Sequence, residues 1–353
     1  MRYIQKIIIK NHNSILNKLI HVITSFVVLS ISLYAQETNS KHFKIIRLTD
    51  GVYAAIHSIG GQAICNAGIV DLGDKTLIID TFLSLKAAQD FQNIANEVTS
   101  HSVHYIINSH YHNDHIRGNQ VFKPKAIIIS TSSTRTAISK NEPNQIEQEG
   151  DFAPKRLAKL EKDIESATGK TQLQELNMWL GYYQALVESH PFQLITLPDI
   201  TFEDNLTIYS TARRVELIEF AGHTKSDIIM YLPEDKIVFT GDLVFIGCHP
   251  YLADGDPQIL VSSLNELKTM DIEKVVPGHG PIGTKDDIFR MIDYIKMLQN
   301  FSKDFVVKGK PIDEVSNIKI PKPYDSWYFP DFFAINMEFM YKIVSKEINP
   351  NKQ

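Results

Sequence analysis

Three histidines and an aspartate lie within six positions of the sequence, directly after the apolar run VHYII. The segment NSHYHNDH at 108–115 contains His110, His112, Asp114 and His115. Side chains two residues apart point the same way in an extended chain, so His110 and His112 can hold one metal ion from one side. Asp114 and His115 can face a second ion about 3.5–4 Å away, the spacing of two-metal sites. The motif therefore predicts half of a metal site rather than an ordinary polar loop.

Three further segments offer the ligands that this half-site lacks. In each, an apolar, strand-like run ends in a loop with a flanking glycine, where rigid scaffolds place functional groups. The segments are EFAGHTKSD with His223, KIVFTGDLVF with Asp242 and KVVPGHGP with His279. Imidazole and carboxylate groups suit zinc, and four such features in one chain predict a metal centre.

The motifs H-x-H-x-D-H, G-H-T, T-G-D and P-G-H-G, in that order, resemble the pattern of the metallo-β-lactamase superfamily over about residues 45–300. The resemblance implies an α/β fold, a four-layer αββα sandwich with the site at one edge. It also implies two zinc ions per chain, with Asp242 as the carboxylate that bridges them. The implied terminal ligands are His110, His112 and His223 for the first ion, and Asp114, His115 and His279 for the second.

Asp80 ends the apolar segment TLIID and matches the buried aspartate that the family carries beside its site. There it would fix the orientation of a metal ligand, although an aspartate at a strand end can also simply form a turn. A mononuclear iron sulfur dioxygenase branch resembles the same pattern, so iron stays an alternative metal. The ligand types favour zinc.

A water molecule shared by two zinc ions loses its proton near neutral pH. We therefore predict a zinc-dependent hydrolase in which this hydroxide attacks the carbonyl group of a small-molecule substrate. Asp114, which would hold the hydroxide in line, and Asp242 are the predicted catalytic carboxylates. A β-lactam, lactone, ester or thioester offers such a carbonyl. The iron sulfur dioxygenase and a glyoxalase II-like thioesterase are the alternatives.

The loop after Asp242 contains the candidates for a substrate pocket. It reads GDLVFIGCHPYLADGDP, and His249, Tyr251 and Asp254 either line the pocket or belong to a structural loop. One β-lactamase subclass has a metal-binding cysteine where this chain has Asp242, and no lysine follows closely to bind a β-lactam carboxylate. The stretch instead resembles a poorly characterised exported branch of the family.

The first 35 residues have the pattern of an export signal. Four basic residues and no acidic residue precede the apolar run LIHVITSFVVLSISLY, which is followed by AQE. This pattern predicts a signal peptide that is cleaved after Ala35, or an uncleaved N-terminal membrane anchor. The protein is therefore predicted to be periplasmic or secreted, with membrane contact only through this segment.

Composition limits the class of protein. A chain of 353 residues with 43% hydrophobic residues can form one or two globular domains. The formal net charge of −5 does not favour binding to phosphate backbones, so no nucleic-acid partner is expected. Cys65 and Cys248 can form at most one disulfide, for which the sequence offers no support.

Strand-like and helix-like segments predict a catalytic domain at 41–300. An amphipathic helical hairpin is predicted at about 154–189, with its turn at Gly169. Its place between the two halves of the metal motif predicts that it packs beside the substrate pocket, and its aromatic stripe indicates packing rather than a cofactor site. The aromatic-rich residues 301–353 are predicted to form a C-terminal packing arm.

Overall fold

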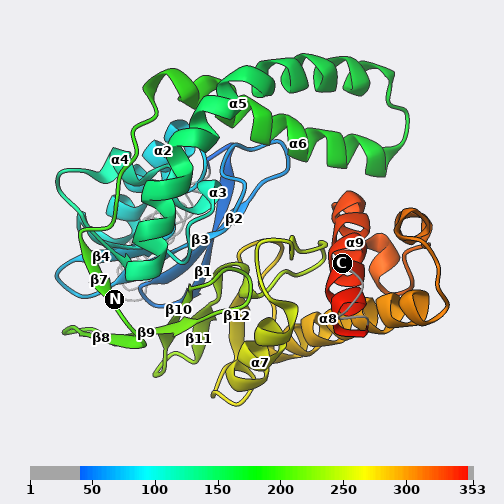
Figure 1. Ribbon diagram of the computed structural model, residues 1–353. Coiled ribbons are helices and arrows are strands. Elements are labelled where there is room, and N and C mark those ends of the chain that lie inside the picture. The colour runs from blue at the N-terminus through cyan, green and yellow to red at the C-terminus, as the bar shows by residue number, and fades with distance from the viewer. Residues whose placement is uncertain (1–39, 349–353) are drawn as a thin grey trace, which may run out of the picture. The chain divides into compact units, whose positions relative to one another are not determined.

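The computed structural model describes residues 40–348, and the predicted export segment at 1–35 lies outside the described residues. Two β-sheets form the centre of the protein (Figure 1). The first contains β1 (Phe43–Thr49), β2 (Val52–His57), β3 (Ala67–Asp71), β4 (Thr76–Ile79), β5 (Val103–Ile107), β6 (Ile127–Thr131) and β7 (Ile200–Phe202). The second contains β8 (Asn205–Tyr209), β9 (Arg214–Phe220), β10 (Asp227–Leu232), β11 (Ile237–Phe239) and β12 (Lys274–Val276).

The strands of the first sheet lie in the order β1-β2-β3-β4-β5-β6-β7, and those of the second in the order β12-β11-β10-β9-β8. Strands β1 to β4 pair antiparallel, and β4 to β7 pair parallel. In the second sheet β11 and β12 pair parallel, and the other pairs are antiparallel. The carboxyl ends of parallel strands meet at one edge of a sheet, which is where such folds bind ligands.

A shared apolar core joins the two sheets. Leu77 and Ile79 of β4 belong to the same buried cluster as Ile228 of β10. The sheets approach closely at Gly68, where a Cβ atom would lie 2.4 Å from the ring of Phe239. Because protein interiors are close-packed, a larger residue at this position would push the sheets apart.

Helices cover the outer face of each sheet. On the first sheet, α2 (Leu85–Thr99) begins at Ser84, whose hydroxyl caps the helix, and buries Phe91. On the second sheet, α7 (Pro257–Leu267) and α8 (Lys285–Val307) share an apolar cluster with the strands. The layers are therefore helix, sheet, sheet and helix, which confirms the predicted α/β αββα sandwich.

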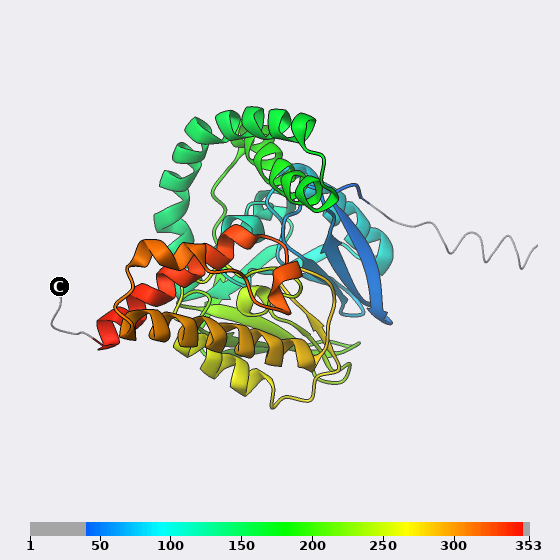
Figure 2. The same cartoon turned by 90° about the vertical axis from the view of Figure 1, so that its right-hand side faces the viewer.

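A helical hairpin lies between β6 and β7 in the chain. It consists of α5 (Ser132–Ser166) and α6 (Lys170–Ser189), which pack together at the top of both views (Figures 1 and 2). The predicted start near residue 154 is corrected, because α5 begins at Ser132. Pro143 and Pro154 lie inside α5, where proline removes a hydrogen-bond donor, and the helix bends along its length (Figure 2).

The C-terminal segment continues the core of the second sheet. Helix α8 runs past the predicted domain boundary at 300 and ends at Val307. Phe333 and Met337 of the last helix are buried in the same cluster as α8, so the predicted packing arm is part of the sandwich. The elements of this segment are η3 (Ile312–Asn317), η4 (Tyr324–Ser326) and α9 (Pro330–Ile348).

Within residues 40–348 no helix is both long and apolar enough to cross a membrane. Cys65 and Cys248 are free thiols buried in different apolar clusters, so the two do not form the disulfide that the sequence left open. The remaining short helices are α3 (Asn113–Ile116), α4 (Asn119–Phe122), η1 (His190–Phe192) and η2 (Gly241–Leu243).

Candidate metal centre

The structure brings the seven predicted metal ligands together at one edge of the two sheets. Each lies in a loop or a short helix that follows a strand, where α/β sheets bind their ligands. His110 and His112 follow β5, Asp114 and His115 lie on α3, His223 lies between β9 and β10, Asp242 lies on η2, and His279 follows β12.

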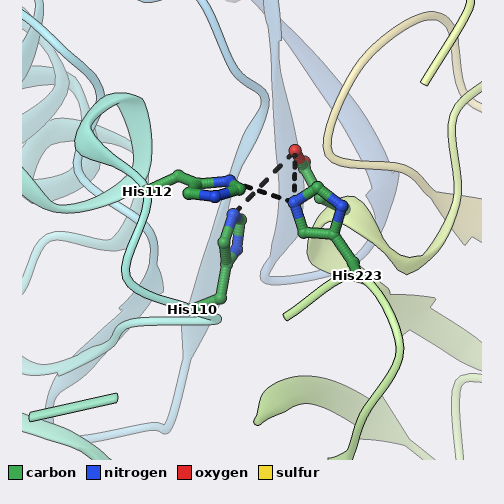
Figure 3. Close-up of side chains that lie close together, drawn as sticks. His110, His112 and His223 are labelled. Atoms are coloured by element: carbon green, nitrogen blue, oxygen red, sulfur yellow. Dashed lines mark hydrogen bonds and ion pairs between the residues drawn. The ribbon is translucent and has the colours of Figure 1, made fainter. Parts of the chain in front are cut away.

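His110, His112 and His223 form the first group, and their rings converge on one point (Figure 3). The ring centroids lie 4.7 to 4.9 Å apart. Nδ1 of His112 is 3.0 Å from Nε2 of His223. Nδ1 of His110 is 3.0 Å from the hydroxyl of Ser109, which leaves its Nε2 for the group.

Asp114, His115 and His279 form the second group. Oδ2 of Asp114 lies 3.7 Å from Nε2 of His115 and 3.4 Å from Nε2 of His279. Behind them, the thiol of Cys65 donates to the backbone oxygen of Asp114 at 2.9 Å. Burial raises the pKa of Cys65 to about 12, so its thiol stays protonated as a buried hydrogen-bond donor.

Asp242 lies between the two groups. Its Oδ2 is 3.4 Å from Nε2 of His223 and 3.3 Å from Nε2 of His279. Its Oδ1 is 3.2 Å from Nε2 of His115. A Cβ atom on Gly278 would lie 1.9 Å from this oxygen, so glycine is needed for the backbone to pass the carboxylate. One carboxylate thus reaches both groups, as a bridging ligand must.

The donor atoms fit divalent metal ions. Nε2 of His110, Nε2 of His115 and Oδ1 of Asp242 are buried and make no well-directed hydrogen bond among the described residues, although the last two atoms lie 3.2 Å apart. Because buried polar atoms are normally paired, a group from outside the chain is needed to satisfy them. Burial holds the pKa of His110 well below its ordinary value and lowers that of His223 to about 3, which keeps both rings in the neutral form that binds metal.

Two carboxylates accept hydrogen bonds from the imidazole rings of predicted metal ligands and so orient these rings. Nδ1 of His115 donates to Oδ2 of Asp80 at 2.7 Å, and Asp80 also accepts from the backbone and hydroxyl of Ser109. Nε2 of His112 donates to Oδ2 of Asp254 at 3.0 Å. Such contacts fix the tautomer and orientation of metal-binding histidines. Asp80 therefore lies where the sequence placed it, and Asp254 orients a ligand in addition to facing the cavity.

The candidate pocket residues separate into two sets. Tyr251 and Asp254 line the cavity beside the ligand groups. His249 is fully buried, with its Nδ1 2.9 Å from the hydroxyl of Tyr294 and its ring packed on Trp327. Of the two alternatives for His249, the structure supports the structural loop and corrects the pocket role, because aromatic side chains from α8 and the C-terminal segment enclose this ring.

Buried charges connect the hairpin to the metal-binding loop. Arg117, two residues after His115, forms ion pairs with Glu142 and Glu149 of α5, and each of the three side chains is at most 5% exposed. Asn113, inside the metal motif, donates to Oε1 of Glu149 at 2.9 Å. Helix α5 thus supports the loop that carries four predicted ligands. No local sequence pattern marks this triad, because its pairs join residues 25 and 32 positions apart.

A cavity of about 440 Å³ opens beside the two ligand groups. Asp114, His223 and Asp242 contribute to its lining, together with side chains of the hairpin and the C-terminal segment. The hairpin therefore borders the cavity, as expected, and aromatic side chains from both of its helices face the cavity. The aromatic lining residues are Phe152, Trp179, Tyr182, Tyr183, Phe245, Tyr251, Phe329 and Phe332.

An αββα sandwich with two groups of histidine and aspartate ligands at one edge defines the class of metallo-β-lactamase-fold proteins. The family model described as the metallo-beta-lactamase superfamily matches residues 60–279, and the chain belongs to this superfamily. The predicted family is thereby confirmed. The family and the ligand groups together imply the use of divalent metal ions.

Two named relatives of the chain are distant in sequence. The linear primary-alkylsulfatase of Pseudomonas sp. is 22% identical over 274 residues, which are 74% of this chain and 51% of that protein. The hydroxyacylglutathione hydrolase of Prochlorococcus marinus is 28% identical over 94 residues, which are 26% of this chain and 38% of that protein. The chain therefore spans about half, or less, of the length of these relatives.

Solved structures share the fold. The metallo-beta-lactamase from Pontibacter korlensis superposes with a TM-score of 0.53 at 16% identity, covering 72% of this chain and 99% of that chain. The DIM-1 metallo-beta-lactamase gives a TM-score of 0.52 at 14% identity, covering 73% of this chain and 99% of that chain. At this level of identity the similarity shows the fold but does not indicate the substrate.

Proposed function

We propose that the protein is an exported di-zinc hydrolase that acts at the carbonyl group of a small-molecule substrate. The observation that carries this proposal is the position of Asp242, whose carboxylate lies within 3.4 Å of imidazoles from both ligand groups. Relatives of the chain bear the names of hydrolases. The first ion would be held by His110, His112 and His223, the second by Asp114, His115 and His279, and both by Asp242.

Bound zinc ions supply an activated water nucleophile near neutral pH and polarise the bond that is cleaved. The residues of the chain prepare the site for this chemistry. Asp80 and Asp254 fix the rings of His115 and His112, so the donor atoms are held in place before metal binds. Asp114 lines the cavity, where its carboxylate can accept a hydrogen bond from the nucleophile and keep it in line with the carbonyl carbon.

The purified mature protein is expected to contain two zinc ions per chain, because its ligands form two groups that share one carboxylate. Elemental analysis measures this content directly. Chelation should abolish ester hydrolysis, and added Zn²⁺ should restore it. A content of one iron and no zinc would contradict the proposal and favour the mononuclear iron sulfur dioxygenase.

The mature chain is expected to begin at or near Gln36, because a basic start and an apolar run precede the segment AQE. N-terminal sequencing of protein from the native host tests this cleavage. Intact Met1 in the membrane fraction would replace cleavage with anchoring, whereas intact Met1 in a soluble cytosolic fraction would contradict export altogether.

A further inference from the structure

We infer that the site takes uncharged carbonyl substrates that carry an aromatic or extended apolar group, and that it rejects their anionic counterparts. This inference rests on the proposed hydrolase function and names its substrate class. Two features of the cavity beside the ligand groups support it. One is a wall of aromatic rings, and the other is the charge of the residues that line the cavity.

The aromatic wall joins three parts of the chain that are distant in sequence. The ring centroid of Trp179, on α6, lies 5.4 Å from that of Phe329 and 6.0 Å from that of Phe332. Phe332 in turn lies 5.6 Å from Tyr251, in the loop after Asp242. The four rings of the wall are all partly exposed and line the cavity. An apolar substrate group that binds here would therefore bury apolar surface of its own and of the rings, and it could stack on them.

The cavity offers no cation for an anionic substrate group away from the metal ligands. Among the described lining residues, none is lysine or arginine. Nδ1 of His57, a further lining residue, accepts a hydrogen bond from the backbone nitrogen of Ile64 at 3.1 Å, so this ring is held in a neutral form. A negative charge at the aromatic wall would lose hydration without gaining a partner, which is costly.

The carboxylates that line the cavity also disfavour an anionic substrate group, since like charges repel. Asp254 accepts hydrogen bonds from the hydroxyl of Tyr111 and from Nε2 of His112, each at 3.0 Å. Asp114 and Asp242 belong to the metal ligand groups. The cavity therefore favours apolar groups over anionic groups next to the reacting carbonyl.

A matched pair of esters tests the inference on the zinc-loaded protein. One is 4-nitrophenyl 3-phenylpropanoate, and the other carries a sulfonate at the para position of the phenyl ring. The two have the same leaving group and carbonyl environment and differ in one permanent negative charge. We expect kcat/KM to be about tenfold higher, or more, for the neutral ester, because the sulfonate has no partner in the wall. Equal values or a preference for the sulfonate would overturn the inference.

Variants connect this preference to the wall. Trp179→Ala should raise KM for the neutral ester about tenfold with little change in kcat, because the ring contacts a group that does not react. Phe332→Lys should raise kcat/KM for the sulfonate by supplying the missing cation. Tyr209→Ala is the matched control, because this ring on β8 is 79% exposed and lies outside the cavity. If both wall variants keep the wild-type ratio of kcat/KM between the neutral and the sulfonated ester, the inference is contradicted.

Ketone binding distinguishes a failure of this inference from a failure of the hydrolase proposal. 4-Phenyl-2-butanone and its para-sulfonate resemble the acyl half of the esters but have no leaving group, so calorimetry measures binding without turnover. Binding of the neutral ketone that is about tenfold tighter than that of the sulfonate supports the inference, whether or not the esters are hydrolysed. If neither ester is hydrolysed, that finding counts only against the hydrolase proposal. Ester hydrolysis with equal binding of both ketones, or with no binding of either, keeps the hydrolase and rejects the substrate class.

Discussion

Asp242→Asn should lower turnover roughly a thousandfold and release the second zinc ion. Asparagine has the size of aspartate, so it fits beside Gly278, but it removes the negative charge that both ligand groups share. One less negative charge then faces two divalent ions, and the second ion should bind weakly. Loss of the shared carboxylate also removes several kcal/mol of transition-state stabilisation.

Zinc content and turnover on the neutral ester measure this effect, and melting temperatures of the metal-free proteins show whether the fold survives. Asp235→Asn is a suitable control, because Asp235 pairs with Arg213 and lies outside the ligand groups. The control should retain two zinc ions and full turnover. An Asp242→Asn protein with both zinc ions and nearly normal turnover would show that Asp242 is not the bridge.

The ligands could be predicted from the sequence because each lies in a short motif beside a strand. His110 and His112 are two positions apart, so local geometry alone places them together. Asp242 and His279 follow β-branched runs that end in glycine-flanked loops. Asp80 also ends such a run, and its contact with His115 follows from the parallel pairing of β4 with β5.

The contacts that complete the site could not be predicted, because they join residues that are distant in sequence. The amphipathic pattern of the hairpin indicates an apolar face, but periodicity does not say what the helix meets. In the structure Trp179 of α6, which the predicted stripe did not include, meets Phe329 near the C-terminus. The two alternatives for His249 could not be separated for the same reason, since its partner Tyr294 lies on α8, 45 positions further along the chain.

The first half of α5 escaped the sequence prediction because its buried face is polar. Its buried positions recur at helical spacing, but two of them are Glu142 and Glu149 rather than apolar residues. Two prolines interrupt the same helix. A hydrophobic pattern cannot reveal a helix whose inner face pairs with Arg117. The architecture of the sandwich was predictable, whereas the support of its metal loop was not.

Arg117→Met should destabilise the protein by about 3–5 kcal/mol. The substitution keeps much of the side-chain volume and leaves Glu142 and Glu149 buried without their cation. Removing one partner of a buried ion pair is costly, since the remaining charge keeps its desolvation penalty. Equilibrium denaturation in urea, compared with the unchanged protein, measures the loss. Lys159→Met on α5 is the matched control, because it breaks an exposed pair with Asp163 and should cost less than about 0.5 kcal/mol.

The loss of stability in the Arg117→Met variant should depend on pH in a defined direction. Burial raises the pKa of Glu142 above its ordinary value of 4.5, and Arg117 opposes this rise. Without Arg117 the pKa in the folded state rises further, so the protonated carboxyl favours the folded variant. The deficit in stability relative to the unchanged protein should therefore be smallest below pH 4.5 and grow as the pH rises through the raised pKa.

Adding Glu142→Gln and Glu149→Gln to Arg117→Met removes both unpaired charges, so it should recover most of the stability and remove the pH dependence. A deficit that is independent of pH and persists in the triple variant would show that packing by Arg117, rather than its charge, holds α5 against the metal-binding loop.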